Sequence, residues 1–210
     1  MAEFSPEFGH ELERLFAWRR DVRRFREDPL PRGELESLVR WAAYAPSVGY
    51  SQPARFVRVA DSKRRQAICE NYETCNTLAA KTYHDERAAL YRSLKLSGLR
   101  EAPVHLAVFL DRETSAGSGL GQATMPLTLH YSVAIAIHTL WLASRARGIG
   151  VGWVSILDPL EVSRILDVPP SWEFIAYLCI GYPQEEHLDR ELVRRGWEAD
   201  DPRVVEIAER

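Results

Sequence analysis

The run of residues 123–144 constrains the fold most, because it contains no charged side chain. It approaches the length of a membrane-spanning helix. Polar side chains such as His130, Ser132 and His138, together with a proline, are too numerous for a helix that faces lipid. We therefore predict one long helix over about 125–147, buried in the centre of the fold or at a subunit interface.

Apolar patterning predicts further helices and strands before and after this run. Helical spacing indicates helices over about 8–18, from Arg32 onward, across 62–97 with a break near 83–85, and over 159–166. Apolar runs and alternation predict strands over 55–60, 103–110, 151–156 and 174–180. Strands that are scattered among helices, without a regular strand–helix–strand order, predict an α+β sandwich.

The length and composition fit a single domain. With 210 residues, of which 46% are hydrophobic and 27% charged, the chain can bury a substantial core. No repeat or low-complexity segment suggests a second domain. We therefore predict one domain over 1–210, with its core at about 10–198. After Gly181-Tyr182-Pro183 ends the last strand, we expect the charged tail to Arg210 to be extended or mobile.

Net charge and cysteine content exclude several functions. A net charge of -3 and a pI near 6.1 give no overall basic field for nucleic acid. Cys69, Cys75 and Cys179 form neither a metal-ligand spacing nor a disulfide framework. The N-terminal residues are acidic where a signal peptide would be basic and then apolar, so we expect a cytoplasmic protein without a membrane segment.

Residues 19–25 form the strongest candidate site, with four arginines around one carboxylate. The segment reads Arg19-Arg20-Asp21-Val22-Arg23-Arg24-Phe25. Like charges repel at this spacing, and a bound anion would relieve the repulsion. Arginine suits phosphate because its planar fork donates two parallel hydrogen bonds. The alternative is a solvated charge run at a helix end, which is the more common meaning of an isolated cluster of this kind.

Glycine, serine and histidine residues elsewhere give no independent site. The run Gly148-Ile149-Gly150-Val151-Gly152 follows a predicted helix and precedes a strand, the reverse of the order in a dinucleotide-binding fingerprint. Ser155 lacks a GxSxG elbow, so taken alone it is a core hydroxyl. His105, His130 and His138 are better explained as hydrogen-bonded core residues than as ligands, and we predict no metal site.

Three segments, taken in order, resemble the flavin-dependent nitroreductase-like superfamily. They are the arginine cluster, the loop Ala45-Pro46-Ser47-Val48-Gly49-Tyr50-Ser51-Gln52-Pro53, and the helix–glycine–strand unit that ends at Trp153. The resemblance covers about residues 10–198. It implies an α+β sandwich with a mixed central sheet flanked by helices, and an obligate homodimer that binds FMN at its interface.

Details of these segments resemble one specialised branch, the flavin destructases of cobalamin lower-ligand synthesis. Asp21 stands where most of the superfamily has serine, a KLxGxREAP pattern occupies residues 95–103, and GIGVGWVSILDP occupies 148–159. Ala54 departs from the branch, which usually has tryptophan there. The branch implies that reduced FMN is a substrate, broken down with molecular oxygen to 5,6-dimethylbenzimidazole and D-erythrose 4-phosphate.

The resemblance also implies roles for individual residues. Asp21 and Ser155 would be catalytic, with Asp21 held as a carboxylate of depressed pKa by its arginine neighbours. Leu96 and its neighbours within 85–122 would form a lid that seals the pocket. The residues expected to bind FMN are Arg19, Arg20, Asp21, Val22, Arg23, Ser47, Ser51, Gln52, Leu96, Gly152, Trp153 and Ser155, with Arg19, Arg23 and Arg20 on the phosphate.

Two other functions remain open from the sequence. One is an FMN-retaining oxidoreductase that reduces nitroaromatics or quinones with NAD(P)H, and the other is a flavin-binding protein without turnover. In a destructase, a separate flavin reductase would supply the reduced FMN, and NAD(P)H would be an indirect electron source. Formation of 5,6-dimethylbenzimidazole identifies the destructase, rapid NAD(P)H consumption with a nitroaromatic identifies the oxidoreductase, and a flavin-binding protein shows neither.

Overall fold

The chain folds around one four-stranded sheet. In a computed structural model, which describes residues 3–200 and 207–209, the strands are β1 (Ala54–Arg58), β2 (Val104–Asp111), β3 (Gly150–Val154) and β4 (Trp172–Gly181). They lie in the order β1-β2-β4-β3, and each neighbouring pair is antiparallel. The four strands predicted from the sequence are confirmed, with small shifts at their ends.

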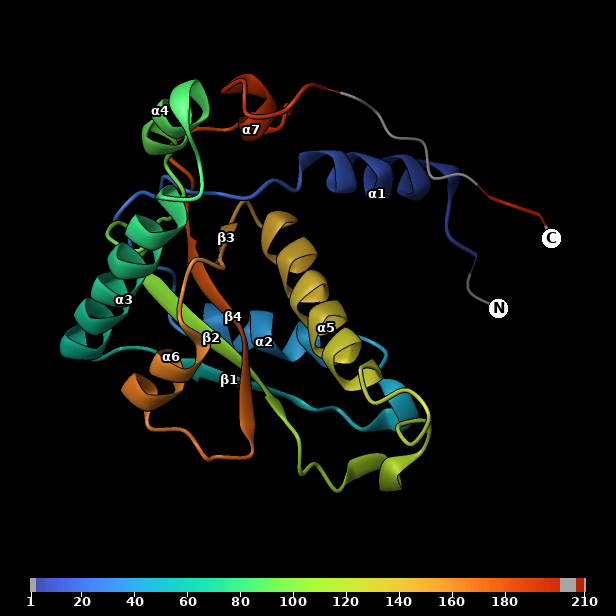
Figure 1. Cartoon of the computed structure of the whole chain (residues 1–210). Helices are drawn as coiled ribbons and strands as arrows, with labels where there is room; N and C mark the ends of the chain where they lie inside the picture. Colours follow the sequence, from blue (N-terminus) through green and yellow to red (C-terminus); the bar gives the residue numbers. More distant parts are fainter. Residues whose placement is uncertain (1–2, 201–206, 210) are drawn as a thin grey trace.

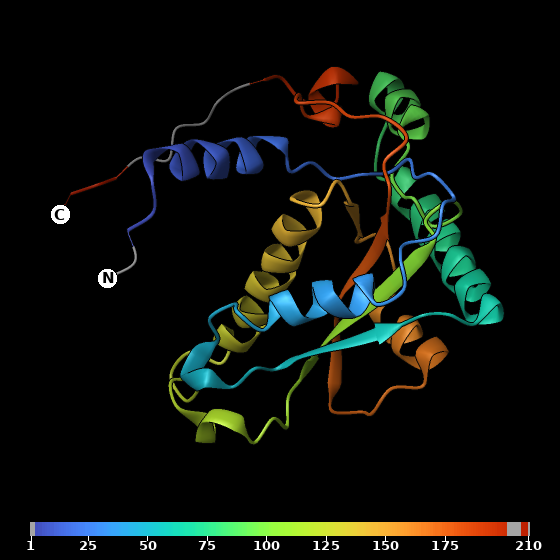
Figure 2. The same cartoon turned by 180° about the vertical axis from the view of Figure 1, so that it is seen from behind.

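Helices cover both faces of the sheet, as Figures 1 and 2 show. On one face lie α2 (Glu34–Ala42) and α5 (Thr128–Arg145), and on the other lie α3 (Ser62–Ala80) and α6 (Pro159–Leu166). At one end of the sheet lie α1 (Pro6–Trp18), α4 (Asp85–Ser93) and α7 (Glu191–Arg194). The predicted α+β sandwich with flanking helices is confirmed.

Alternation along the central strands builds a hydrophobic core on each face. Leu106 and Val108 of β2 belong to the core cluster beneath α2 and α5. Ala107 and Phe109, which point the other way, belong to the cluster beneath α3 and α6. Because β2 is buried on both faces, its sequence is almost continuously apolar.

The expectation of a mixed sheet is wrong for these four strands, which pair only in antiparallel fashion. Among the described residues, the one parallel pairing is an isolated bridge between Asp21 and Val151. Val22 donates its backbone N–H to the Val151 carbonyl at 3.1 Å. The arginine-rich segment 19–25 therefore runs along the free edge of β3, and the sheet anchors its backbone.

The uncharged run forms α5, which is buried on one side only. Ile137 and Leu140 are fully buried against the sheet, whereas Tyr131 and Ile135 are 51% and 42% exposed. Gly148 ends the helix at a φ of +70°, and the next N–H bonds back to the Ser144 carbonyl at 3.0 Å. The predicted long helix and its glycine cap are confirmed, but a single chain does not bury the helix completely.

Residues 184–198 fold back over the end of the sheet, where α7 lies beside α4 (Figures 1 and 2). The Trp197 ring meets the rings of Tyr83 and Tyr91, with centroids 5.2 and 6.0 Å apart. The Arg87 guanidinium stacks on the same indole at 3.8 Å. The prediction of an extended or mobile tail is therefore wrong for this segment, and residues 201–206 and 210 of that tail lie outside the described residues.

Residues 85–122 do not form one continuous lid. The range includes β2, a buried central strand of the sheet. Residues 94–101 lie at the start of this strand and residues 112–122 at its end. The eight residues of β2 separate the two segments by roughly 26 Å. A lid around Leu96 could therefore include residues before β2 but not the strand itself, which cannot move without opening the core, and the lid stays a prediction.

Candidate active site

Close backbone approaches fix residues 19–25 against the sheet, and glycines permit them. A Cβ atom on Gly152 would lie 2.1 Å from the Val22 carbonyl oxygen, and one on Gly98 would lie 2.3 Å from the buried Phe25 ring. A Cβ on Gly150 would lie 2.8 Å from the Val22 side chain. The glycines that sequence analysis associates with a cofactor therefore have a packing role, because they hold the backbone of the arginine cluster in place.

Asp21 is held from two sides. Its Oδ2 accepts a hydrogen bond from Arg23 Nε at 2.8 Å, and its Oδ1 accepts one from the Trp153 backbone N–H at 2.9 Å. Arg23, whose side chain is 14% exposed, also donates from Nη1 to the Lys95 carbonyl at 3.2 Å. The structure thus brings together five of the predicted site residues, namely Asp21, Val22, Arg23, Gly152 and Trp153.

The pKa of Asp21 lies above its ordinary value, not below it as sequence analysis predicts. Burial is the largest cause, and the negative charge of Glu191 adds to it. The Arg23 guanidinium and the Trp153 N–H act in the opposite direction but do not overcome the loss of hydration. The sequence shows the arginines around Asp21, but it does not show how far the folded chain removes water from the carboxylate.

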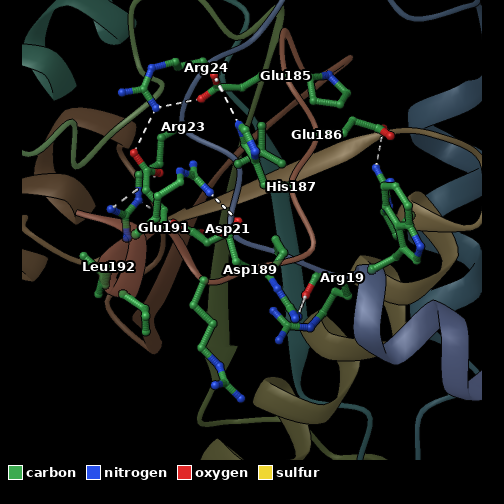
Figure 3. A pocket seen from close by; sticks show the side chains of 18 of the residues that line it. Arg19, Asp21, Arg23, Arg24, Glu185, Glu186, His187, Asp189, Glu191 and Leu192 are labelled. Atoms are coloured by element: carbon green, nitrogen blue, oxygen red, sulfur yellow. Dashed lines mark hydrogen bonds and ion pairs between the residues drawn. The ribbon is translucent and has the colours of Figure 1, made fainter. Parts of the chain in front are cut away.

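A cavity of about 470 Å³ opens beside Asp21, between residues 18–24 and residues 183–199 (Figure 3). Seven arginines and six carboxylates line it, and five of these carboxylates come from the C-terminal segment. Arg24, for example, pairs with Glu191 at 2.9 Å and with Glu185 at 3.1 Å. Repulsion among the arginines therefore does not by itself require a bound anion, because the protein supplies much of the opposing charge.

Arg19 and Arg20 are exceptions to this pairing. Among the described residues, neither has a carboxylate within ion-pair distance: Arg19 lies over the Trp141 ring, and Arg20 donates to the backbone carbonyls of Leu188 and Arg19. Burial and the positive charges of Arg19 and Arg190 lower the pKa of Arg20. A local excess of positive charge remains here, and it suits a phosphate group.

The serine-rich loop lies at the other end of α5. The Val48 N–H donates to Ser132 Oγ near the start of the helix at 3.0 Å, whereas Arg19 stacks on Trp141 near its end. Those two helix positions are roughly 14 Å apart along the axis. Within one chain, the structure therefore does not bring Ser47, Ser51 and Gln52 together with the arginine cluster.

The loop itself is well defined and holds an unsatisfied hydroxyl. Ser47 Oγ accepts the Gln52 N–H at 3.1 Å, and Thr114 donates to the Ser51 carbonyl at 2.9 Å. Ser51 is fully buried, yet its Oγ has no hydrogen-bond partner among the described residues. A buried hydroxyl without a partner is costly and marks a place where another group completes the structure.

Leu96 and Ser155 do not line the cavity beside Asp21. Leu96 lines a separate hollow of about 200 Å³ with Tyr72 and Glu101. Ser155 is exposed just past the end of β3, on the same side of the strand as Trp153. Their roles in binding and catalysis stay predictions.

Sequence reasoning missed the residues of the C-terminal segment, above all Arg190, Glu191 and Arg194. Five carboxylates of the C-terminal segment oppose the arginines of residues 19–24, namely Glu185, Glu186, Asp189, Glu191 and Glu198. No local rule links two charged stretches that are so far apart in the chain. Only the return of β4 toward this end of the sheet places them face to face.

The described residues contain neither a metal-binding cluster nor a helix that could span a membrane. No group of three or more histidine, cysteine, aspartate or glutamate side chains in that part of the chain is arranged to hold a metal ion. None of its helices combines the length and apolar character needed to cross a bilayer.

Comparisons with known proteins agree with the fold. Residues 16–182 match the model of the nitroreductase family. A 5,6-dimethylbenzimidazole synthase of Rhodospirillum rubrum is 56% identical over 202 residues, covering 96% of both chains. A second 5,6-dimethylbenzimidazole synthase, from Rhodobacter capsulatus, is 45% identical over 199 residues, covering 95% of this chain and 96% of its own.

Solved structures show the same fold at low identity. An iodotyrosine deiodinase bound to FMN and 3-iodo-L-tyrosine superposes with a TM-score of 0.73 and 24% identity, covering 94% of this chain and 97% of its own. The antiparallel sheet with helices on both faces defines the class as an α+β sandwich. The chain belongs to the nitroreductase family.

Proposed function

We propose that this chain is an oxygen-dependent 5,6-dimethylbenzimidazole synthase. It would break reduced FMN down to 5,6-dimethylbenzimidazole and D-erythrose 4-phosphate, and so supply the lower ligand of cobalamin. The observation that carries the proposal is Asp21, a carboxylate fixed by Arg23 and the Trp153 N–H at the wall of an arginine-lined cavity. The identity to two synthases over almost the whole chain supports the same activity.

The residues present fit FMN. Arg19 and Arg20 carry uncompensated positive charge and would hold the phosphate, while Arg23 is engaged by Asp21. Ser51, with its orphaned hydroxyl, and the neighbouring Gln52 would bind polar groups of the flavin. When bound, reduced FMN would supply both the electrons that activate molecular oxygen and the carbon skeleton of the product.

Asp21 would move a proton during fragmentation. A carboxyl whose pKa is raised by burial exchanges protons more readily near neutral pH than an ordinary aspartate does. The two hydrogen bonds to its oxygens fix the direction in which it can accept a proton from the ribityl chain or the ring. Ser155 would orient the reacting group by hydrogen bonding.

The site would be completed in a homodimer. The arginine cluster and the serine loop lie at opposite ends of α5, and the exposed apolar side of this helix offers Tyr131 and Ile135 for contact with a second copy. Two copies of α5 packed antiparallel about a two-fold axis would bring the loop of one chain to the arginines of the other. FMN would then lie at the interface.

Other components follow from this chemistry. A separate flavin reductase would deliver reduced FMN, with NAD(P)H as the indirect electron source, and molecular oxygen would be the co-substrate. All three cysteines are free, which suits a reducing compartment such as the cytoplasm.

The test is a product assay. The protein is mixed anaerobically with reduced FMN, air is admitted, and 5,6-dimethylbenzimidazole is sought by fluorescence and mass spectrometry. A parallel sample receives NAD(P)H and a nitroaromatic compound. We expect the benzimidazole in the first sample. Complete return of intact FMN, with rapid NAD(P)H oxidation in the second sample, would instead establish an ordinary nitroreductase.

A further inference from the structure

A chain of ion pairs links Asp21 to α7. Arg23 bonds Asp21 through Nε, and its Nη1 lies 4.0 Å from Oε2 of Glu191. The other oxygen of Glu191, Oε1, accepts a hydrogen bond from Arg24 Nη1 at 2.9 Å. The Glu191 side chain is only 14% exposed, so its charge is poorly screened by water. Figure 3 shows these side chains converging at one wall of the cavity.

We infer that Glu191 is a positioning residue, whose carboxylate shares Arg23 with Asp21 and so sets the orientation and charge of the carboxylate at the cavity wall. The inference rests on the proposed function, because it assigns Glu191 to the reaction that Asp21 serves. Glu191 does not itself touch the cavity's reacting groups; it acts through Arg23.

Several other groups surround Asp21, and Glu191 differs from them because it carries a negative charge. Arg23 comes from the same segment as Asp21, and β3 contributes the neutral Trp153 N–H. From β4 comes Cys179, a thiol whose pKa burial raises, so that it stays neutral. In the neighbouring segment 94–101, the Lys95 carbonyl accepts a hydrogen bond from Arg23, and the Lys95 side chain pairs with Glu101.

Glu191 therefore shares Arg23 with Asp21, since its Oε2 lies 4.0 Å from Arg23 Nη1, and its negative charge adds to the raised pKa of Asp21. Its removal would leave Arg23 with a single carboxylate partner. Arg23 would then stabilise ionised Asp21 more fully, and Asp21 would give up its proton at a lower pH.

The first experiment measures the titration of Asp21 directly. The carboxyl carbons of aspartate are labelled with 13C, the Asp21 signal is assigned by its loss in Asp21→Asn, and its midpoint is followed in protein without FMN. Glu191→Gln, which keeps the size but removes the charge, should lower the midpoint by about half a pH unit or more. Glu191→Asp, which keeps the charge, should stay nearer to the wild type.

Two control variants, each of which also replaces a glutamate by glutamine, show how large a shift of the Asp21 midpoint is specific to Glu191. Glu185→Gln removes a charge that pairs with Arg24 but not within ion-pair distance of Arg23, so its shift should be smaller. Glu161→Gln removes an exposed charge that pairs with Arg164, far from Asp21 in the fold, and should not shift the midpoint. An unchanged midpoint in Glu191→Gln, or an equal shift in Glu185→Gln, would overturn the inference.

The second experiment connects the residue with turnover. The pH dependence of 5,6-dimethylbenzimidazole formation should move to lower pH in Glu191→Gln, by about the shift that NMR records, while FMN affinity is kept. If the wild type forms no benzimidazole, the proposed function fails but the NMR result still decides the link to Asp21. A shifted midpoint with an unshifted pH profile would remove Glu191 from the reaction.

Discussion

At the scale of single residues, the side chains of Arg19 and Arg20 differ from those of Arg23 and Arg24. The first two reach only aromatic and carbonyl groups, whereas the second two are tied to carboxylates. We expect Arg20→Ala to weaken FMN binding about 10- to 100-fold, since a charge-assisted hydrogen bond to phosphate contributes about 1.5–3 kcal/mol. Flavin fluorescence quenching measures the affinity.

Riboflavin, which lacks the phosphate, is the matched ligand for this experiment. Its affinity should be the same in Arg20→Ala and in the wild type. Arg164→Ala, which removes an exposed arginine paired with Glu161, should leave both affinities unchanged. A parallel loss of riboflavin affinity in Arg20→Ala would show that the arginine supports the loop rather than the phosphate.

His105 makes folding stability depend on pH. It is buried, bonds to the Tyr177 hydroxyl through Nδ1 at 3.0 Å, and its pKa is lowered to about 4 by burial and by Arg65. Between pH 6.5 and 4, His105 is protonated in the unfolded chain but stays neutral in the folded chain. The free energy of unfolding therefore decreases as the pH is lowered through this range. The loss from this group should approach about 3 kcal/mol below pH 4.

Urea unfolding at several pH values tests this prediction. His105→Gln keeps a side chain that can bond to Tyr177 but cannot titrate, so its free energy of unfolding should fall less steeply between pH 6.5 and 4. His10→Gln on α1 removes an exposed histidine and should follow the wild-type curve. Equal slopes for His105→Gln and the wild type would contradict the assigned pKa.

The sequence predicts single residues unevenly. It places Asp21, Arg23, Gly152 and Trp153 in one site, and the structure brings them together. It fails on the direction of the Asp21 pKa, because burial depends on the whole fold and not on neighbours in the chain. The role of Glu191 cannot be predicted for the same reason, because its neighbours in the sequence do not show which arginines it contacts in the fold.

At the scale of elements, the contact between β3 and residues 19–25 requires glycine on β3, because a Cβ atom there would collide with Val22. Gly152→Ala would place a Cβ 2.1 Å from the Val22 carbonyl oxygen, so backbone must shift. We expect a loss of about 3 kcal/mol in the free energy of unfolding. Gly9→Ala in α1, where a Cβ meets nothing within 4 Å, should instead gain up to about 1 kcal/mol. Both free energies of unfolding are measured by chemical denaturation. Similar changes for Gly152→Ala and Gly9→Ala would refute the close approach of Gly152 to the Val22 carbonyl.

Elements with strong local signals are predicted well. The apolar run of β2, the glycine after α5 and the Asp158-Pro159 start of α6 each specify an element through its own residues. The antiparallel pairing of the strands and the fold-back of residues 184–198 are not predicted. Each depends on which distant segments meet, and periodicity along the chain carries no such information.

At the scale of the whole molecule, a site shared between two chains makes a specific prediction for mixed dimers. Asp21→Asn and the double variant Ser47→Ala/Gln52→Ala are prepared as separate inactive proteins and then exchanged into heterodimers. If each site combines the arginine cluster of one chain with the serine loop of the other, one of the two sites in every heterodimer is intact. Benzimidazole formation should therefore return in the mixture.

A site built within one chain predicts the opposite. Each subunit of the heterodimer would then carry one defect in its own site, and mixing would restore nothing. Wild-type protein carried through the same exchange controls for losses during handling. Failure to regain activity after confirmed exchange would place both segments in the same subunit's site.

The fate of FMN in wild type and Asp21→Asn tests the central claim most directly. Both proteins are loaded with one equivalent of reduced FMN and exposed to air, and the products are quantified by mass spectrometry. We predict that the wild type converts FMN to 5,6-dimethylbenzimidazole and that Asp21→Asn, although it binds FMN, returns it intact. Equal benzimidazole yields would remove Asp21 from the chemistry, and intact FMN from both proteins would contradict flavin destruction altogether.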